Sequence, residues 1–172
     1  LGFPVKSTAW PVTIFLLVLS SFLYWRYRPR FQLKSFAPFA AVLALALVLT
    51  GRPMFLYGFN WISYANEDMA NYVLSAERLF NYSYMARPSL QTYLDNTDES
   101  VHFWFFHVYL GIRTGSDLLL AWLMGITGKS PLQIFMPLIL TFHLMLTGSA
   151  AALVYRHAGQ RSAALLTALL LA

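Results

Sequence analysis

Long apolar segments alternate with polar connections along this 172-residue chain. Three of them lie at about 9–25, 36–56 and 132–155. Each comes close to or exceeds the length that an α-helix needs to cross a bilayer, which is roughly 20 residues. A further apolar run starts near residue 162 and is too short to cross by its end at Ala172. The pattern predicts an all-α, polytopic transmembrane protein, and we expect residues 1–172 to be the N-terminal fragment of one membrane domain in a longer protein.

The connection at about 57–115 contains one segment with a helical repeat. Residues 67–80 place apolar side chains three or four positions apart, which predicts an amphipathic helix. Asn66 is suited to cap its first turn, because a short polar side chain can accept hydrogen bonds from free backbone N–H groups. The predicted apolar face consists of Met69, Tyr72, Val73, Ala76 and Phe80.

Two shorter apolar stretches, at 101–110 and 117–127, follow the polar and aromatic residues 81–100. Neither is long enough to cross a bilayer, but each suits a helix that lies at the level of the lipid headgroups. We therefore expect juxtamembrane helices that rest on the outer leaflet or dip into it.

The composition also favours a membrane protein. Hydrophobic residues make up 58% of the chain and charged residues only 11%. Ordinary soluble domains contain about 25% charged residues. The formal charge of +5 does not indicate a nucleic-acid partner, because the basic residues lie beside apolar spans rather than in one soluble patch. The absence of cysteine within these residues excludes disulfides, thiolate nucleophiles and cysteine metal ligands.

Basic residues beside the spans predict the topology, since arginine and lysine concentrate in cytoplasmic loops. They cluster after the first span and after the third: Arg26, Arg28, Arg30 and Lys34, then Arg156 and Arg161. We therefore expect the N-terminus and the 57–115 loop to be extracytoplasmic. We also expect segment 101–128 to stay on that side without crossing.

The acidic residues occupy a single window. All seven lie between residues 67 and 117, and the first two, Glu67 and Asp68, are adjacent. This window is therefore where we expect acid–base chemistry. The alternative is that both acids only stabilise the first turn of a surface helix, where the helix dipole favours negative charge.

The order of these elements resembles the GT-C superfamily of membrane glycosyltransferases. In that family the first long extracytoplasmic loop carries an essential Asp near its start, an aromatic residue four positions on and an Ala four beyond that. The matching residues here are Asp68, Tyr72 and Ala76. Met69 stands where the family often has Glu, and Glu67 adds an acid before Asp68, so either carboxylate can be the primary one.

The later part of the chain extends this resemblance to about residues 36–172. Gly115–Trp122, Gly128–Pro131 and the run that ends at Arg161–Ala172 resemble the family's usual segment after the loop. The family's Pro-Pro-Leu-Tyr-Tyr motif is absent, and His102–Phe106 stands roughly in its place.

The resemblance implies transfer of a sugar from a polyprenyl-phosphate donor to an acceptor on the extracytoplasmic face, in the inner (plasma) membrane of a bacterium. It implies Asp68 as the base that removes the acceptor proton, with Glu67 as partner or alternative. Arginine suits the leaving phosphate because its planar fork binds phosphate through two hydrogen bonds. We expect the substrate-binding residues to be Tyr72, Arg87, His102 and Arg113.

Each of these residues also has a plainer interpretation. The arginines can extend toward lipid headgroups. His102 and His107, five residues apart, are more typical of packing or interfacial histidines than of joint metal ligands. We expect no cofactor, although a pair of carboxylates can bind a divalent metal ion. The sequence leaves the oligomeric state open.

Two other functions fit the same layout. A transporter or flippase for a lipid-linked or anionic substrate would need ionisable or Gly/Pro-broken sites in the middle of its spans, and residues 40–49 contain none. A non-catalytic scaffold for assembly of the cell envelope would leave Asp68 facing no cavity. The surroundings of Asp68 therefore separate these interpretations.

Overall fold

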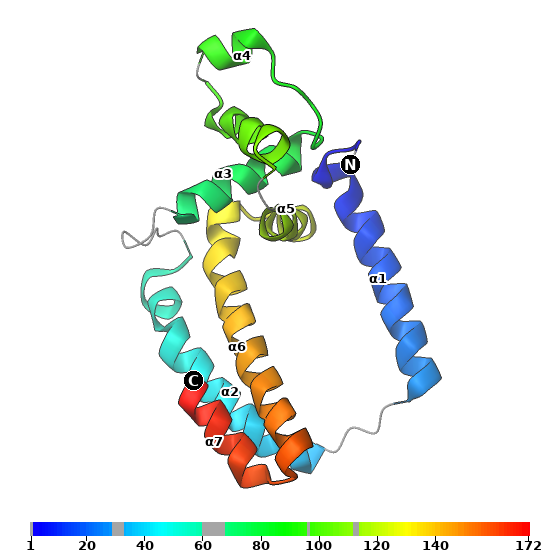
Figure 1. Ribbon diagram of the computed structural model, residues 1–172, viewed down its shortest axis with the longest axis vertical. Coiled ribbons are helices and arrows are strands. Elements are labelled where there is room, and N and C mark those ends of the chain that lie inside the picture. The colour runs from blue at the N-terminus through cyan, green and yellow to red at the C-terminus, as the bar shows by residue number, and fades with distance from the viewer. Residues whose placement is uncertain (1, 29–32, 60–67, 96, 112–113) are drawn as a thin grey trace. The chain divides into compact units, whose positions relative to one another are not determined.

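The computed structural model describes residues 2–28, 33–59, 68–95, 97–111 and 114–172, which form helices and connections without a β-strand (Figure 1). The elements in chain order are α1 (Val5–Tyr27), α2 (Leu33–Tyr57), α3 (Asp68–Asn81), α4 (Leu90–Asp95), the 3-10 helix η1 (Glu99–His102), the π-helix η2 (Phe105–Tyr109), α5 (Gly115–Thr127), α6 (Pro131–Ala158) and α7 (Arg161–Leu171). The all-α class predicted from the sequence is confirmed for these residues.

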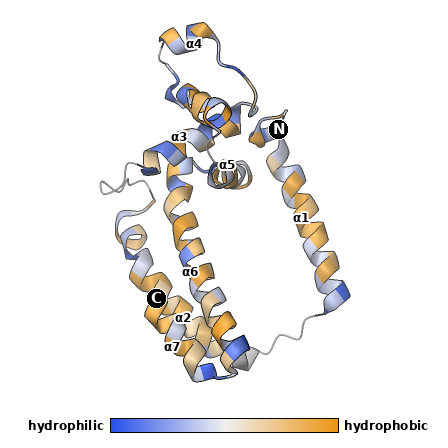
Figure 2. Ribbon diagram, in the orientation of Figure 1, coloured by the Kyte–Doolittle hydropathy of each residue, from blue (hydrophilic) through white to orange (hydrophobic). Residues whose placement is uncertain are grey.

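Three of the helices have the length and apolar composition of membrane spans. They are α1 with 23 residues, the Phe36–Tyr57 part of α2 with 22, and α6 with 28. Figure 2 shows hydrophobic residues along most of their length. Ala9 is the one residue that α1 buries, so nearly all of its apolar surface is exposed and suited to lipid chains. The three predicted spans are present as helices, each somewhat longer than its apolar segment.

The chain forms two compact units. The first combines Leu1–Arg28 with Asn60–Phe135, and the second combines Pro29–Phe59 with Met136–Ala172. In the first unit α5 packs against both α1 and α3, and α3 also packs against α1 and η1. In the second unit α7 packs against α2. The acid-bearing window of the sequence therefore belongs to the first unit.

Close approach of α1 and α5 depends on small residues. A Cβ atom added to Gly125 would lie closer than 3.0 Å to the Cβ of Ala9, a separation that real Cβ atoms almost never show. One turn away, the indole Nε1 of Trp122 donates to the carbonyl of Ala9 at 3.1 Å and to the hydroxyl of Thr13 at 3.0 Å. The absent side chain of Gly125 thus lets α5 come near enough for Trp122 to bond to the backbone of α1.

Small residues also build the core of the second unit. Val42, Ala151, Ala164 and Ala168 form one buried cluster, with Phe39 and Leu165 among the partly buried residues around it. Lipid chains are as apolar as these side chains, so helix association in a membrane relies on close packing rather than on the hydrophobic effect. Alanine permits that close packing because its side chain is a single methyl group, which lets two helix backbones approach closely.

The amphipathic helix predicted at 67–80 is present as α3, while Glu67 and the cap residue Asn66 lie outside the described residues. Met69 and Ala76 are buried as expected. The rest of the predicted apolar face is less buried, and Tyr72 is 40% exposed. The residues that α3 buries in addition are Ser75, Arg78 and Leu79.

Arg78 is a buried structural residue that the apolar pattern missed. Its Nη2 donates to the carbonyl of Ala86, and its guanidinium lies 4.1 Å from the ring centre of Tyr82. Burial lowers the pKa of Arg78 from its ordinary value, and Tyr82 and Asp98 act in the opposite direction. The side chain therefore ties α3 to the loop that follows it.

Residues 90–111 differ from the prediction. Helix α4 was not predicted, because its six residues carry no apolar repeat. The single helix expected at 101–110 is instead η1 followed by η2. Asp98 starts η1 by accepting from the backbone N–H of Ser100 at 3.0 Å, which satisfies a free amide at the helix start. The apolar stretch at 117–127 is helical as predicted, within α5.

Candidate functional site

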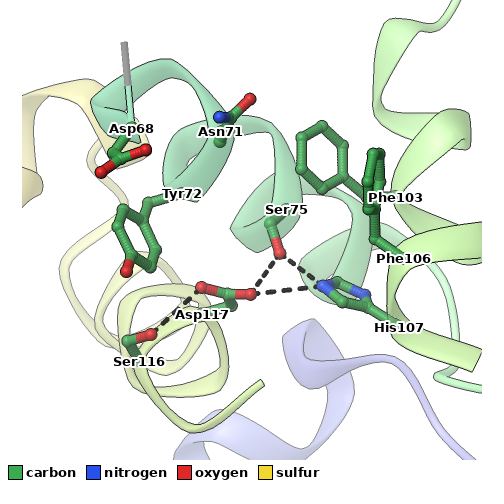
Figure 3. Close-up of a pocket in the computed structure, with 9 residues that line it drawn as sticks. All are labelled: Asp68, Asn71, Tyr72, Ser75, Phe103, Phe106, His107, Ser116 and Asp117. Atoms are coloured by element: carbon green, nitrogen blue, oxygen red, sulfur yellow. Dashed lines mark hydrogen bonds and ion pairs between the residues drawn. The ribbon is translucent and has the colours of Figure 1, made fainter. Parts of the chain in front are cut away.

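A cavity of about 470 Å³ lies in the first unit, beside α3, η2 and α5 (Figure 3). Its volume falls within the range of typical small-molecule sites, roughly 300–1,000 Å³. Its walls combine carboxylates, hydroxyls, an amide, an imidazole and three aromatic rings. The lining residues are Asp68, Asn71, Tyr72, Ser75, Phe103, Phe106, His107, Ser116 and Asp117.

Helix α3 supplies one wall through its periodicity. Asp68, Tyr72 and Ser75 are separated by four and three residues, so they lie on one side of the helix. Asp68 begins the helix, where the dipole favours a negative charge. The ring of Tyr72 also packs against Phe135, with ring centres 5.9 Å apart. Asp68 and Tyr72 are exposed, whereas Ser75 is 2% exposed, so the wall runs from an accessible end to a buried one.

At the buried end, three side chains from different elements meet in one cluster. The hydroxyl of Ser75 lies 2.6 Å from Nε2 of His107 and donates to Oδ2 of Asp117. The same Nε2 lies 3.2 Å from Oδ2 of Asp117. His107 is 3% exposed and Asp117 5%, so the cluster is almost fully shielded from solvent. We call these three residues the polar cluster.

Neighbouring groups hold the polar cluster in place. The hydroxyl of Tyr84 donates to the backbone carbonyl of His107 at 2.7 Å, and the two rings stack with centres 6.2 Å apart. Asp117 lies in the first turn of α5, where free backbone N–H groups favour a carboxylate. Ser116 donates to its Oδ1 at 3.3 Å. His107 and Asp117 are therefore each held by a neighbouring group outside the polar cluster.

The polar cluster contains serine, histidine and aspartate but lacks the geometry of a hydrolase triad. A triad needs the acid on Nδ1 of the histidine and the serine on Nε2, so that the acid orients the ring while Nε2 takes the serine proton. Here Ser75 and Asp117 both contact Nε2 of His107. Asp117 therefore competes with Ser75 for one nitrogen, and the arrangement does not favour nucleophilic attack by Ser75.

The structure brings together two of the residues expected at the site. Asp68 and Tyr72 line the cavity. Arg87 and His102 are exposed and do not line it, and His102 instead meets the edge of the Tyr93 ring, with centres 5.3 Å apart. Glu67 and Arg113 lie outside the described residues.

No arginine or lysine is found among the described residues of the cavity wall. The expected cation for a leaving phosphate is thus not identified among them. Across the part of the chain that the structure describes, no three His, Asp or Glu side chains are grouped as metal ligands. His107 and Asp117 form a pair without a third such side chain among the described residues, and the hydroxyl of Ser75 contacts both.

The polar cluster was missed from the sequence. His107 was interpreted as a packing or interfacial histidine, and Ser75 and Asp117 were not singled out. One signal was present for Ser75, because it lies seven residues after Asp68 and therefore on the same side of α3. No comparable signal existed for His107 and Asp117, which approach Ser75 from 32 and 42 residues away in the sequence.

No protein-family model, curated protein or solved structure matches this chain. The case for its function therefore comes from its own residues and their geometry.

Proposed function

We propose that the chain belongs to a GT-C-like membrane glycosyltransferase that moves a sugar from a polyprenyl-phosphate donor to an acceptor on the extracytoplasmic face. The observation that carries the proposal is that Asp68 lines a cavity of about 470 Å³ together with aromatic and polar side chains. A scaffold has no need of such a cavity beside its carboxylate. The helices long and apolar enough to span a bilayer support a membrane-borne donor.

Asp68 is the proposed base. The acceptor oxygen attacks the anomeric carbon of the donor and forms the new C–O bond, while the bond from that carbon to the phosphate oxygen breaks. The phosphate leaves with the bonding electrons, and the carboxylate of Asp68 takes the acceptor proton. A positioned base typically contributes about 10²–10⁴ in rate. Glu67 precedes Asp68 in the sequence and is the alternative base.

The aromatic residues of the cavity suit a sugar. Tyr72, Phe103 and Phe106 line the same space as Asp68. An aromatic face attracts partial positive charge, such as that on the C–H groups of a sugar ring. Asn71 lines the cavity as well, and its amide has both donors and an acceptor. The walls therefore combine apolar faces with polar groups, as carbohydrate recognition requires.

The remaining assignments are part of the same proposal. The 57–115 loop and the N-terminus lie outside the cytoplasm of a bacterium, at its inner membrane. Arg87, Arg113 and His102 are the residues that we propose to bind the phosphate or the acceptor, although Arg87 and His102 do not line the described cavity. No cofactor is required for the transfer, because the bond from the anomeric carbon to phosphate already gives the sugar a good leaving group.

The test replaces Asp68 by Asn in the full-length protein and measures transfer of radiolabelled sugar from polyprenyl-phosphate donors in membranes. We expect a loss of about 100-fold or more, the size expected for removal of a base. Asp95→Asn is the matched control, since Asp95 is an exposed carboxylate on α4 that does not line the cavity. Unchanged turnover in Asp68→Asn removes Asp68 from the mechanism, and loss in Glu67→Gln alone makes Glu67 the base. Movement of labelled lipid across the membrane without bond formation would instead favour a flippase.

A further inference from the structure

The proposed transfer step leaves the polar cluster without a role. Ser75, His107 and Asp117 are 2%, 3% and 5% exposed, whereas Asp68 and Tyr72 on the same cavity are accessible. A buried polar group costs free energy unless it is hydrogen-bonded, and a buried ion pair is often no more stable than apolar residues of the same volume. Fold stability alone therefore does not account for a carboxylate and an imidazole at this wall.

The contacts within the polar cluster limit where its hydrogens can lie. Ser75 has a single hydroxyl hydrogen and lies within bonding distance of both other members. An ionised carboxylate accepts hydrogen bonds but donates none. With Asp117 ionised, all three contacts are hydrogen bonds only when Nε2 of His107 carries a hydrogen. Ser75 then donates to Asp117, and His107 donates to both.

This arrangement leaves acceptor positions free and uses the donors. A carboxylate has about four acceptor positions, and the described partners of Asp117 are Ser75, His107 and Ser116. The oxygen of Ser75 keeps one lone pair after it accepts from His107. The hydroxyl hydrogen of Ser75 and the hydrogen on Nε2 are already committed. The polar cluster can therefore receive hydrogen bonds from a ligand, but these atoms have none to offer it.

We propose that the polar cluster binds hydroxyl groups of the donor's sugar ring, with Asp117 and Ser75 as the acceptors. Sugar hydroxyls can donate hydrogen bonds as well as accept them, whereas the oxygens of an ionised phosphate only accept. The lipid phosphate is therefore excluded from this wall by chemistry as well as by the charge of Asp117. Phe103 and Phe106 line the same cavity and present rings to the apolar face of the sugar.

This inference rests on the proposed function and adds an orientation to it. The sugar lies against the α5 side of the cavity, where Asp117 and Ser116 are found. The phosphate and its lipid lie away from Asp117. The acceptor then approaches Asp68, which lines the cavity from the start of α3.

The test measures binding of methyl hexosides and their monodeoxy analogues to the full-length protein in detergent. For the wild-type protein, at least one deoxy analogue should bind about 10- to 100-fold more weakly than its parent, as expected for one lost hydrogen bond to a charged group. In Ser75→Ala and Asp117→Asn this difference should shrink to a few-fold, because the acceptor is removed or neutralised. Asp95→Asn is the control and should keep the wild-type difference.

Three results overturn the inference. One is that no methyl hexoside binds the wild-type protein at millimolar concentration. Another is that the difference in affinity between each deoxy analogue and its parent hexoside is as large in both variants as in the wild type. The third is that sugar-free polyprenyl phosphate loses affinity in Ser75→Ala while the hexosides do not. Thermal unfolding checks that each variant folds, and Ser75→Ala, which removes one oxygen atom, carries the test if Asp117→Asn does not fold.

The outcome is separable from that of Asp68→Asn. If Asp68→Asn loses turnover but hexoside binding does not depend on Asp117, the proposed transferase activity stands. The sugar-binding role of the polar cluster is then rejected. If Asp68→Asn keeps its turnover and hexoside binding depends on Asp117, the sugar-binding role of the polar cluster stands. Asp68 is then rejected as the base.

Discussion

Replacing Gly125 by Ala tests the close packing of α1 and α5. The added Cβ would lie closer than 3.0 Å to the Cβ of Ala9, which is 1% exposed and has no rotamer through which to move away. Carbon atoms in contact are most stable at about 3.5–4.0 Å. The two helix backbones must therefore separate by about 0.5–1 Å or more to restore an ordinary contact.

Three terms set the expected change in the free energy of unfolding on Gly125→Ala. An added methyl group in a packed core costs about 1–3 kcal/mol. Separation of the helices also weakens the hydrogen bonds of Trp122 to Ala9 and Thr13, and a hydrogen bond is worth about 0.5–1.5 kcal/mol. Alanine gains about 1 kcal/mol over glycine through its helix propensity. The net expectation is a loss of about 1–3 kcal/mol.

The matched control is Gly148→Ala. Gly148 lies inside α6, and a Cβ added there meets nothing within 4 Å. This variant should gain up to about 1 kcal/mol from helix propensity alone. Both variants are measured in the full-length protein by unfolding in mixed micelles of increasing SDS content.

The swap Ala9→Gly with Gly125→Ala provides a second check. It moves the methyl group from α1 to α5, so it should recover much of the stability that Gly125→Ala loses. Equal stability of Gly125→Ala and Gly148→Ala would refute the close packing of α1 and α5, and so would a swap no more stable than Gly125→Ala.

Two further predictions concern Tyr93 and the topology. The hydroxyl of Tyr93 is buried without a hydrogen-bond partner in the described structure, so Tyr93→Phe should stabilise the fold by about 1 kcal/mol in the same SDS assay. Burial raises the pKa of Tyr93 in the folded protein. The contribution of this group to wild-type stability is therefore fully present below about pH 10, the ordinary tyrosine pKa, and is lost as the pH rises through the pKa of the folded state. Tyr93→Phe should lack that alkaline loss, and an unchanged pH profile would contradict the assignment. In intact cells a membrane-impermeant maleimide should label Leu94→Cys, which replaces a 72% exposed side chain, and label His157→Cys only after permeabilisation. Residues 1–172 contain no cysteine that would add background labelling. The opposite labelling pattern would place the 57–115 loop in the cytoplasm.

The spans and α3 were predictable because each depends on a local pattern. Length and apolar composition suffice for α1, α2 and α6, and a repeat of three to four residues suffices for α3. Helix α4 had no such pattern, and the apolar stretch at 101–110 predicted a helix without indicating the π-helix η2. Their form depends on contacts with distant residues, such as the bond from Tyr84 to the carbonyl of His107.

The candidate site divides in the same way. Asp68 and Tyr72 were placed together because they share a face of one helix. His107 and Asp117 reach Ser75 only through tertiary folding, from elements separated in the sequence. The comparison of His107 with His102 concerned a shared helix face, whereas the structure places them in η2 and η1 with different neighbours. The arginines expected at the phosphate could not be placed by sequence, because no periodic pattern links them to α3.

Two buried polar groupings in the first unit show why the polar cluster, rather than Arg78, points to a ligand. Arg78 has its guanidinium against Tyr82 and its hydrogen bond on Ala86, and it does not line the cavity. Its contacts join parts of the fold. All members of the polar cluster line the cavity, and their free positions are acceptors. Helix α5 carries Asp117 at its first turn and packs Gly125 against α1, about two turns later. A displacement of α5 in Gly125→Ala should therefore weaken hexoside binding as well as stability, whereas Gly148→Ala should weaken neither.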